Sequence, residues 1–344
     1  VIYHIQNLQG FRIKNSKKTK IDFKENDYQI DFSQVQGQNT AKRGLLISAS
    51  GGHNMAMYGP PGTGKTMLAK AFIGILPQLT KEEILEVTSI YSVSKLLDKA
   101  FIVNPPFRSP HHTSSYASLV GGGNFPQPGE ITLSHRGVLF LDEFIEFERS
   151  VIDALRQPLE DGLITISRAK GKITFPAKCI LLASMNPCAC GYAGNKGCTC
   201  TVKELQQHKK KLSGPIIDRI DIWSSVHKVE YDNLANPDKN NVTSKEMREL
   251  VKKVRKIQID RYRKFGIKNK SLNSDMSVQD INTIIKLNSN VKNLLSKSAE
   301  RLNMSGRAYH RTLKVARTIA DLEYKQDINE EHVLEALQYR QRDF

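Results

Sequence analysis

The chain has 344 residues, of which 39% are hydrophobic and 25% are charged, and its formal net charge is +16. That length can bury a sizeable core and, at roughly 100–200 residues per domain, predicts two domains of ordinary globular composition. No apolar run approaches the roughly 18 residues of a membrane-spanning helix, so we expect no membrane partner.

The charge balance favours an anionic partner such as nucleic acid, although basic, solvated helix faces explain it equally well. The first residues, VIYHIQNLQG, lack the basic end and apolar stretch of a signal peptide, so we expect a cytoplasmic protein. In a reducing compartment, clustered cysteines are more often metal ligands or catalytic groups than disulfides.

The first chemical motif is GPPGTGKT, which follows a short apolar strand and precedes an amphipathic helix. This is a P-loop in its required strand, loop, helix context, and it predicts a site for ATP with Mg²⁺. Lys65 would reach the β- and γ-phosphates and the Thr66 hydroxyl would bind Mg²⁺, while the glycines let backbone N–H groups turn toward the phosphates. The predicted ATP-binding residues here are Gly59, Pro60, Pro61, Gly62, Thr63, Gly64, Lys65 and Thr66.

A segment rich in Pro, Gly, Ser and His follows at about residues 104–130. Two adjacent histidines in it suggest a metal site, but in an extended chain His111 and His112 would point to opposite sides and chelate poorly. We therefore assign this segment no specific chemistry.

The next motif is RGVLFLDEF, whose apolar run Val138 to Leu141 predicts a central parallel strand. Asp142 at its end would hold Mg²⁺ through water, and Glu143 would polarise the attacking water, because α/β sheets place chemistry at strand ends. Surface acids at a strand end are the alternative reading.

An alternating pattern at about residues 163–178 predicts a β-hairpin around the turn Ala169 to Gly171. Three basic residues lie at its tip, namely Arg168, Lys170 and Lys172. They are candidates for contacting a DNA backbone without reading sequence, or else they belong to an ordinary solvent-exposed turn.

Another buried strand, KCILLASMNP, ends at Asn186, which could reach a γ-phosphate from the side and help to position water. Four cysteines follow within residues 188–200, as two CxC pairs separated by seven residues: Cys188, Cys190, Cys198 and Cys200. The pattern predicts a structural Zn²⁺ site of the Cys₄ type; a reversible dithiol switch and unligated thiols are the alternatives.

These segments together resemble the AAA+ ATPases. The stretches FRSPHHTSSYASLVGGG, PGEITLSHRGVLFLDE, ALRQPLEDG and SMNPCACGY look like the ChlI-related magnesium-chelatase branch, and within it the YifB/ComM group implicated in natural transformation. The resemblance covers roughly residues 30 to 340. It implies an α/β fold, with a P-loop domain built on a central parallel sheet and a small all-helical lid domain after it.

The resemblance also implies a domain plan. Residues 1–29 would be a linker, residues 30–232 the ATPase domain with a helix-2 insertion at about 104–130, and residues 233–344 the helical lid. Because members of this group normally carry a Lon-like domain before the ATPase, we expect this chain to be a fragment or an excised module.

The resemblance further implies a homohexameric ring in which a neighbouring subunit donates an arginine to each nucleotide. Arg219 in LSGPIIDRIDIW is the candidate finger, and pairing with Asp218 or Asp221 is the alternative. In the lid, Arg307 is the candidate for a second sensor of the γ-phosphate and Arg311 is the next choice.

We therefore expect an ATP-driven motor on single-stranded or branched DNA, a helicase or branch-migration enzyme acting with recombination proteins. The alternative is a protein remodeller like the magnesium chelatase motor, whose pore would present aromatic rather than basic residues. A slow nucleotide switch is disfavoured because Glu143 is present.

Overall fold

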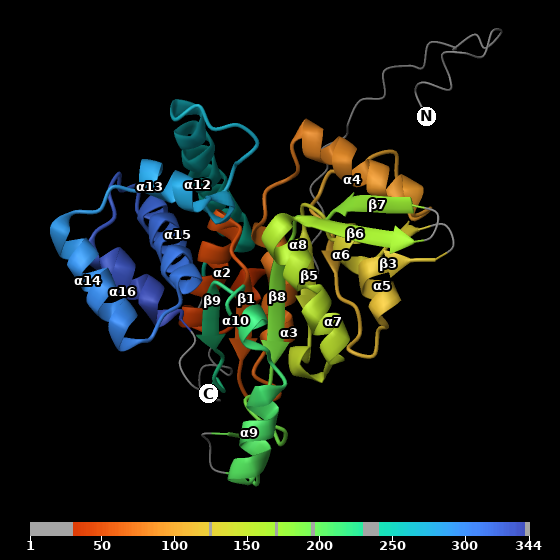
Figure 1. Cartoon of the computed structure of the whole chain (residues 1–344), viewed down its shortest axis with the longest axis horizontal. Coiled ribbons are helices and arrows are strands. Elements are labelled where there is room, and N and C mark those ends of the chain that lie inside the picture. The colour runs from red at the N-terminus through yellow and green to blue at the C-terminus, as the bar shows by residue number, and fades with distance from the viewer. Residues whose placement is uncertain (1–29, 124–125, 169–170, 194–196, 230–240, 341–344) are drawn as a thin grey trace.

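The computed structural model describes residues 30–123, 126–168, 171–193, 197–229 and 241–340. A five-stranded sheet with the order β2-β5-β8-β1-β9 forms its centre, and every neighbouring pair is parallel (Figure 1). The strands are β1 (Met55–Tyr58), β2 (Phe107–Arg108), β5 (Val138–Leu141), β8 (Ile180–Met185) and β9 (Ile222–Ser225). Since all five point the same way, their last residues form one edge of the sheet, the carboxyl edge, and their first residues form the amino edge.

Both faces of the sheet are covered, which explains why its central strands read as continuous apolar runs. Side chains alternate between two hydrophobic clusters: Val138 and Phe140 face one side, while Leu139 and Leu141 face the other. The first face packs against α2 (Asn39–Gly51) and α3 (Lys65–Phe72). The second face packs against α5 (Tyr116–Val120), α6 (Glu130–Leu133), α7 (Arg149–Ala154), α8 (Arg156–Asp161) and α10 (Gly214–Ile217).

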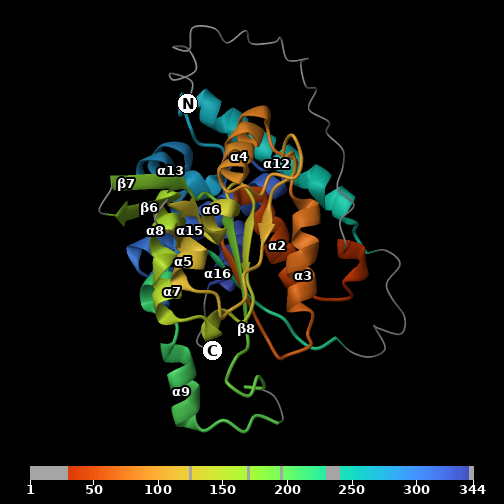
Figure 2. The same ribbon diagram turned by 90° about the vertical axis from the view of Figure 1, so that its right-hand side faces the viewer.

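Short elements and one outlying helix complete this part of the chain. They are η1 (Phe32–Gln34), η2 (Ile73–Ile75), α4 (Lys81–Val93), β3 (Gly121–Gly122), β4 (Gln127–Pro128) and η3 (Phe144–Glu146). A hairpin of β6 (Leu163–Arg168) and β7 (Gly171–Pro176) pairs Arg168 with Gly171 at its tip. Helix α9 (Val202–Lys210) projects from the body in both views (Figures 1 and 2).

Several helices begin at a capping box that can be read from the sequence. The hydroxyl of Thr80 accepts the backbone N–H of Glu83 at the start of α4, and the Glu83 carboxylate accepts the N–H of Thr80 in return. The same reciprocal pair starts α9 and the long α12 (Ser244–Lys264). Each box satisfies backbone donors that the first helical turn leaves unpaired.

The chain after residue 241 is helical in its described part. It forms α12, η4 (Asn273–Asp275), α13 (Val278–Ile284), α14 (Ser289–Arg301), α15 (Gly306–Leu322) and α16 (Glu330–Gln338). These results confirm the predicted fold class, an α/β domain with a central parallel sheet followed by a helical region. None of the described helices is long and apolar enough to cross a membrane.

The helical region packs directly on the sheet domain through α2. One hydrophobic cluster runs from the sheet through α2 into α12, α15 and α16, and the backbone N–H of Trp223 in β9 donates to the Tyr339 carbonyl at 2.8 Å. The predicted boundary between residues 232 and 233 lies outside the described residues, as does the predicted linker 1–29, so these domain limits stay predictions.

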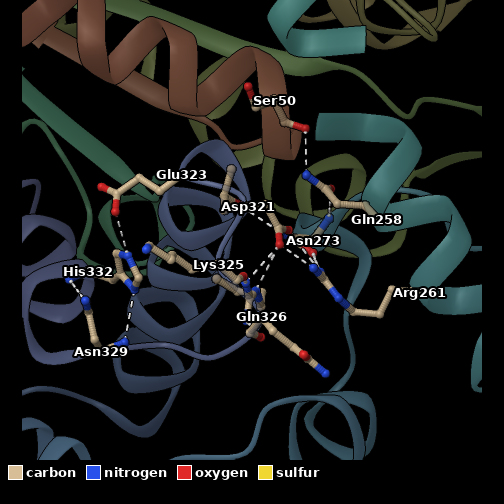
Figure 3. Close-up of polar contacts among 12 residues, drawn as sticks. Ser50, Gln258, Arg261, Asn273, Asp321, Glu323, Lys325, Gln326, Asn329 and His332 are labelled. Carbon is tan, nitrogen blue, oxygen red and sulfur yellow. Dashed lines mark hydrogen bonds and ion pairs between the residues drawn. The ribbon is translucent and has the colours of Figure 1, made fainter. Parts of the chain in front are cut away.

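A buried polar network joins α12, η4 and α15 beneath the end of α2 (Figure 3). The Asp321 carboxylate, only 1% exposed, accepts hydrogen bonds from Arg261, from Asn273 at 2.9 Å and from Arg317 at 3.1 Å. Gln258 extends the network to α2 by donating to the Ser50 carbonyl at 3.1 Å. Asp321 is therefore the anion that neutralises two largely buried guanidinium groups.

We predict that Asp321→Asn lowers the free energy of unfolding by about 3–5 kcal/mol, because it leaves Arg261 and Arg317 without their buried counter-charge. Urea denaturation followed by circular dichroism measures this. The control is Asp260→Asn, which removes the exposed pair with Arg263 on α12 and should cost about 1 kcal/mol or less. Equal losses in the two variants would contradict the assigned role of Asp321.

Candidate active site

The predicted P-loop joins the end of β1 to the start of α3 at the carboxyl edge of the sheet. Two of its positions require glycine: Gly64 has φ of 91°, and a Cβ on Gly59 would lie 2.0 Å from the Val226 carbonyl oxygen. The loop is therefore clamped against the end of β9, and the N-terminus of α3 opens directly onto it.

Lys65 is held inside this loop. Its ammonium group donates to the carbonyls of Gly59 and Pro60, at 2.7 and 2.8 Å, and lies 3.3 Å from the side-chain oxygen of Asn186. Burial lowers the pKa of Lys65 below its usual value, and the charge of Asp142 partly opposes this effect. The two predicted γ-phosphate contacts, Lys65 and Asn186, thus come together from different strands.

Asp142 lies at the end of β5, facing the P-loop. Its carboxylate accepts hydrogen bonds from the Thr66 hydroxyl at 2.8 Å, from the Ser184 hydroxyl of β8 and from the backbone N–H of Glu143 at 3.0 Å. A hydroxyl beside a carboxylate is a set of hard oxygen ligands that suits Mg²⁺. The residues present therefore fit the ion that the P-loop implies.

Glu143, two residues after the end of β5, has an unusual backbone conformation. It adopts the left-handed region with φ of 52° and ψ of 44°, a conformation that costs a non-glycine residue energy and is common at functional sites. Its carboxylate is 54% exposed and lies 2.9 Å from Nδ1 of His112. Sequence reasoning gave His112 no role, yet the structure brings it to the predicted catalytic acid.

The four clustered cysteines hang from the end of β8 beside the P-loop. Their sulfur atoms all lie within 4.8 Å of one another, and the Cys188–Cys190, Cys188–Cys198 and Cys190–Cys198 separations are 3.3, 3.9 and 3.7 Å. Tetrahedral zinc with bonds of about 2.3 Å places its sulfurs about 3.8 Å apart, so this donor set fits zinc. The backbone N–H groups of Tyr192 and Thr199 lower the pKa of Cys190 to about 6, which favours its thiolate. A backbone hydrogen bond lowers the pKa of Cys198 and of Cys200, but burial and hydrogen bonds with the neighbouring thiols outweigh it and raise both pKa values.

The cysteine loop touches the nucleotide-binding residues directly. A Cβ on Gly191 would lie 2.8 Å from Cδ of Pro61 in the P-loop, and His208 of α9 donates to the Asn186 carbonyl at 3.1 Å. The loop and α9 therefore support both Pro61 and Asn186 from outside.

The three predicted arginines lie at the other side of the sheet. Arg311 of α15 contacts Asp221, the residue just before β9, and Arg219 and Arg307 both contact the carboxylate of Glu160 in α8. Arg219 is 8% exposed and also donates to two backbone carbonyls, whereas the Arg307 side chain is 61% exposed.

This placement overturns one alternative: Arg219 pairs with Glu160 rather than with Asp218 or Asp221. Arg307 contacts the same carboxylate at the amino edge, whereas Lys65 is at the carboxyl edge. The roles of Arg219 as a finger and of Arg307 as a second sensor stay predictions. Burial alone would raise the pKa of Asp221, but Arg311 and His53 outweigh it and hold that pKa below its ordinary value.

A cavity that sequence reasoning missed opens beside the P-loop. Its volume is about 250 Å³, and it lies between the start of α2 and the segment after β9. The Gln38 amide bridges these walls by donating to the His227 carbonyl at 2.5 Å and the Thr63 carbonyl at 3.4 Å. Gly37 and Gln38, which both have left-handed backbone conformations, form the opening of this cavity. The string QGQN just before a helix is the feature of the sequence that could have indicated such a turn.

The predicted DNA contacts are only partly described. Lys172 is exposed on β7, Arg168 is placed by its backbone at the end of β6, and Lys170 lies outside the described residues. On the same hairpin, Ile164 and Ile166 are buried in the hydrophobic cluster that also contains Leu119 and Val120 of α5.

Comparison with known proteins gives two family matches. Residues 31–234 match the family described as magnesium chelatase, subunit ChlI, and residues 241–340 match its C-terminal family. The chain is 46% identical over 313 residues to competence protein ComM of Haemophilus influenzae and 43% identical over 318 residues to the uncharacterized protein YifB of Escherichia coli. These alignments cover 90% and 91% of this chain but 60% of each relative, so the chain spans about three fifths of their length.

A more distant relative is the magnesium-chelatase 38 kDa subunit of Rhodobacter capsulatus. It is 25% identical over 174 residues, covering 45% of this chain and 50% of that protein.

We predict that Gly191→Ala weakens ATP binding about tenfold, because the added methyl group displaces Pro61 and overpacking of this kind costs ~1–3 kcal/mol. Gly197→Ala is the matched control: it also lies in the cysteine loop with positive φ, but nothing lies within 4 Å of its added Cβ. Fluorescence titration with an ATP analogue compares the two variants. Equal affinities would show that the cysteine loop does not support the P-loop.

Proposed function

This chain belongs to the magnesium chelatase ChlI family as a YifB/ComM-like AAA+ protein, and we propose that it hydrolyses Mg-ATP in a ring of subunits to translocate on DNA. The main support for ATP hydrolysis is a group of side chains that lie together at one edge of the sheet. They are Lys65, Thr66, Asp142 and Asn186, with Glu143 beside them. The surrounding cavity near Gln38 has room for a nucleobase.

In this proposal each residue acts through the atom that the structure presents. Lys65 exchanges its contacts with the loop carbonyls for the β- and γ-phosphates, and Asn186 orients the γ-phosphate from the side. Glu143 accepts a proton from the attacking water as its oxygen bonds to the γ-phosphorus and ADP leaves. Thr66 and Asp142 would hold Mg²⁺, and the ion would neutralise charge that develops on the phosphate oxygens.

The arginines support a site shared between subunits. The three arginines lie together at the amino edge, away from the P-loop of their own chain. We therefore propose that Arg219 and Arg307 reach the nucleotide of a neighbouring subunit. Arg311 would stabilise this edge through its ion pair with Asp221. A finger supplied in this way stabilises charge in the transition state and is worth ~10³–10⁵ in rate. A cleft of about 820 Å³ between α8, α12 and α15 lies at this amino edge, next to Glu160.

DNA is the proposed substrate for three reasons. The net charge is +16, and the β6–β7 hairpin carries basic residues at its tip. A relative named competence protein ComM also aligns with 90% of the chain. We propose single-stranded or branched DNA as the track, and action with recombination proteins in natural transformation.

A protein-remodelling motor is the second candidate. The likeness to the magnesium-chelatase 38 kDa subunit favours it, as do both family matches. The two candidates differ in whether DNA stimulates hydrolysis.

We predict that DNA stimulates ATP hydrolysis by the wild type, with Lys65→Ala as the blank. Replacing Arg168, Lys170 and Lys172 together by alanine should abolish most of this stimulation and reduce the slope of log affinity against log salt by about 0.7 per lost phosphate contact on a single strand. Steady-state hydrolysis and DNA titrations at several salt concentrations measure both effects.

The control removes the same charge from the exposed face of α14, as Lys292→Ala, Lys297→Ala and Arg301→Ala together. It should retain stimulation. If the wild type hydrolyses ATP at one rate with and without DNA, the protein-remodelling reading replaces the DNA motor.

The cysteine cluster is proposed to hold one structural Zn²⁺ through Cys188, Cys190, Cys198 and Cys200. Bound there, the ion would supply folding energy to a loop with little apolar content of its own. This loop would then present Gly191 to Pro61 in a fixed position.

We predict one zinc per chain by metal analysis of the purified protein, and loss of that zinc in a Cys198→Ser, Cys200→Ser double variant, because two ligands are removed. Cys179→Ser is the control, since this fifth cysteine lies outside the cluster. If the purified protein contains no metal and its four thiols form reversible disulfides, a redox switch would replace the zinc proposal.

A further inference from the structure

The cleft at the amino edge of the sheet lies between the two domains of the chain. Its volume is about 820 Å³, and its walls come from α8 on the sheet domain, from α12 and α15 of the helical region, and from the segments that lead into β5, β8 and β9 (Figure 1). We call it the interdomain cleft. Sites for small molecules commonly have volumes of about 300–1,000 Å³. No P-loop residue lines this cleft, so it is separate from the site at the carboxyl edge.

The walls of the interdomain cleft carry more basic than acidic residues. Nine lysines and arginines and six aspartates and glutamates line it, so positive charge is in excess. Five of the six acids already form ion pairs with arginine or lysine, and these are Glu83, Glu160, Asp221, Asp260 and Asp275. The sixth, Asp161, is exposed to solvent. The acids of the cleft are therefore largely neutralised by partners of their own.

Three of the basic residues have no carboxylate within ion-pair distance in the part of the chain that the structure describes. They are Arg255 and Lys256 of α12 and Lys314 of α15. Arg255 donates through Nε and Nη2 to the Ala49 carbonyl, at 3.0 and 2.6 Å, and Lys314 donates to the Ser274 carbonyl at 2.9 Å. A carbonyl oxygen accepts a hydrogen bond but does not neutralise a charge, so these cations lack a counter-ion.

Two of these three cations are partly removed from water. Arg255 and Lys314 are both half-buried, whereas Lys256 is exposed. Burial lowers the pKa of Arg255 to about 10, although the charges of Glu83 and Asp275 oppose this effect. Burial also lowers the pKa of Lys314, against the opposing charge of Asp221. The surroundings thus disfavour both charged forms, and an anion placed beside them would stabilise them.

The cleft also offers an apolar surface. Leu76 and Leu79 line it from the sheet domain, and Ile259 of α12 and Met276 line it from the helical region. Ile259 lies four residues after Arg255 and three after Lys256, so these side chains share one face of α12. A ligand with an anionic end and a less polar body would therefore meet complementary groups from both domains.

We propose that the interdomain cleft binds a small phosphate-bearing molecule, held by Arg255, Lys256 and Lys314 between the helical region and the sheet domain. Guanidinium and ammonium groups are the usual protein ligands of phosphate oxygens. Nη1 of Arg255 is available for this contact, because it has no hydrogen-bond partner among the described residues. The proposal does not depend on ATP hydrolysis or on a neighbouring subunit, since one chain supplies every residue of the site.

The test is isothermal titration calorimetry of Lys65→Ala protein with inorganic tripolyphosphate and, separately, with GTP. The variant lacks the P-loop lysine, so phosphate binding at the carboxyl edge is weakened. We expect one site that weakens about ten- to a hundredfold when Lys314→Ala is added, because a charged hydrogen bond in a half-buried site is lost. Residual binding at the P-loop would not respond to Lys314→Ala. Tighter binding of GTP than of tripolyphosphate would assign the site to a nucleotide, and equal binding would assign it to the phosphates alone.

Further variants separate loss of charge from loss of structure. Lys314→Arg keeps the charge and should retain most of the affinity. Lys256→Ala changes an exposed side chain that is not expected to affect folding, and it should weaken binding up to about fivefold. Lys297→Ala on the exposed face of α14 is the matched control and should bind as tightly as its Lys65→Ala parent.

A second readout is thermal unfolding, because a ligand that binds only the folded state raises the Tm. Tripolyphosphate should raise the Tm of Lys65→Ala protein and should raise that of the Lys65→Ala, Lys314→Ala variant much less. Failure of both tripolyphosphate and GTP to bind Lys65→Ala protein would overturn the proposal. Affinities that are unchanged in both Lys314→Ala and Lys256→Ala would also overturn it, because binding would then take place elsewhere.

Discussion

The parallel alignment of β1, β5 and β8 is the constraint on which this site depends. Each strand is almost entirely apolar and is buried on both faces, so polar residues such as Ser184 of β8 stand at or near its end. Because the strands are adjacent and point the same way, those ends meet at one edge. This alignment brings Asp142 and Asn186 each within hydrogen-bonding distance of a P-loop residue, although 121 residues separate Lys65 from Asn186.

The two edges of the sheet carry opposite halves of one chemistry. The residues proposed to bind phosphate and magnesium lie at the carboxyl edge, and arginines that pair with acids lie at the amino edge. Neither half is complete by itself, because the sheet separates Lys65 from Arg219 and Arg307. This separation favours an assembly in which the amino edge of one subunit faces the carboxyl edge of the next. The lid strengthens the arrangement, since the buried network around Asp321 fixes α15, which carries both Arg307 and Arg311, to the sheet domain.

Two segments that follow strands of the sheet contact the site in different ways. The cysteine loop extends from β8 and packs Gly191 against Pro61, which makes it a static support. The helix-2 insertion extends from β2, carries His112 to within 2.9 Å of Glu143 and shares a hydrophobic cluster with the hairpin that is proposed to meet DNA. The predicted ligand positions and the contact of His112 with Glu143 are thus built on strands of the same sheet.

Much of this protein could be predicted from its sequence. The strand, loop and helix of the P-loop, the acidic pair after a buried strand, the hairpin alternation and the spacing of four cysteines are local signals, since each depends on neighbours in the chain. The contact between His112 and Glu143, the cavity beside Gln38, and the pairing of Arg219 and Arg307 with Glu160 are not local. They depend on which strands are adjacent and on where the lid packs. The sequence by itself determined which chemical groups are available and on which kinds of element they lie; only the tertiary structure decided which of them meet, because contacts between distant segments are set by the packing of the whole sheet and lid.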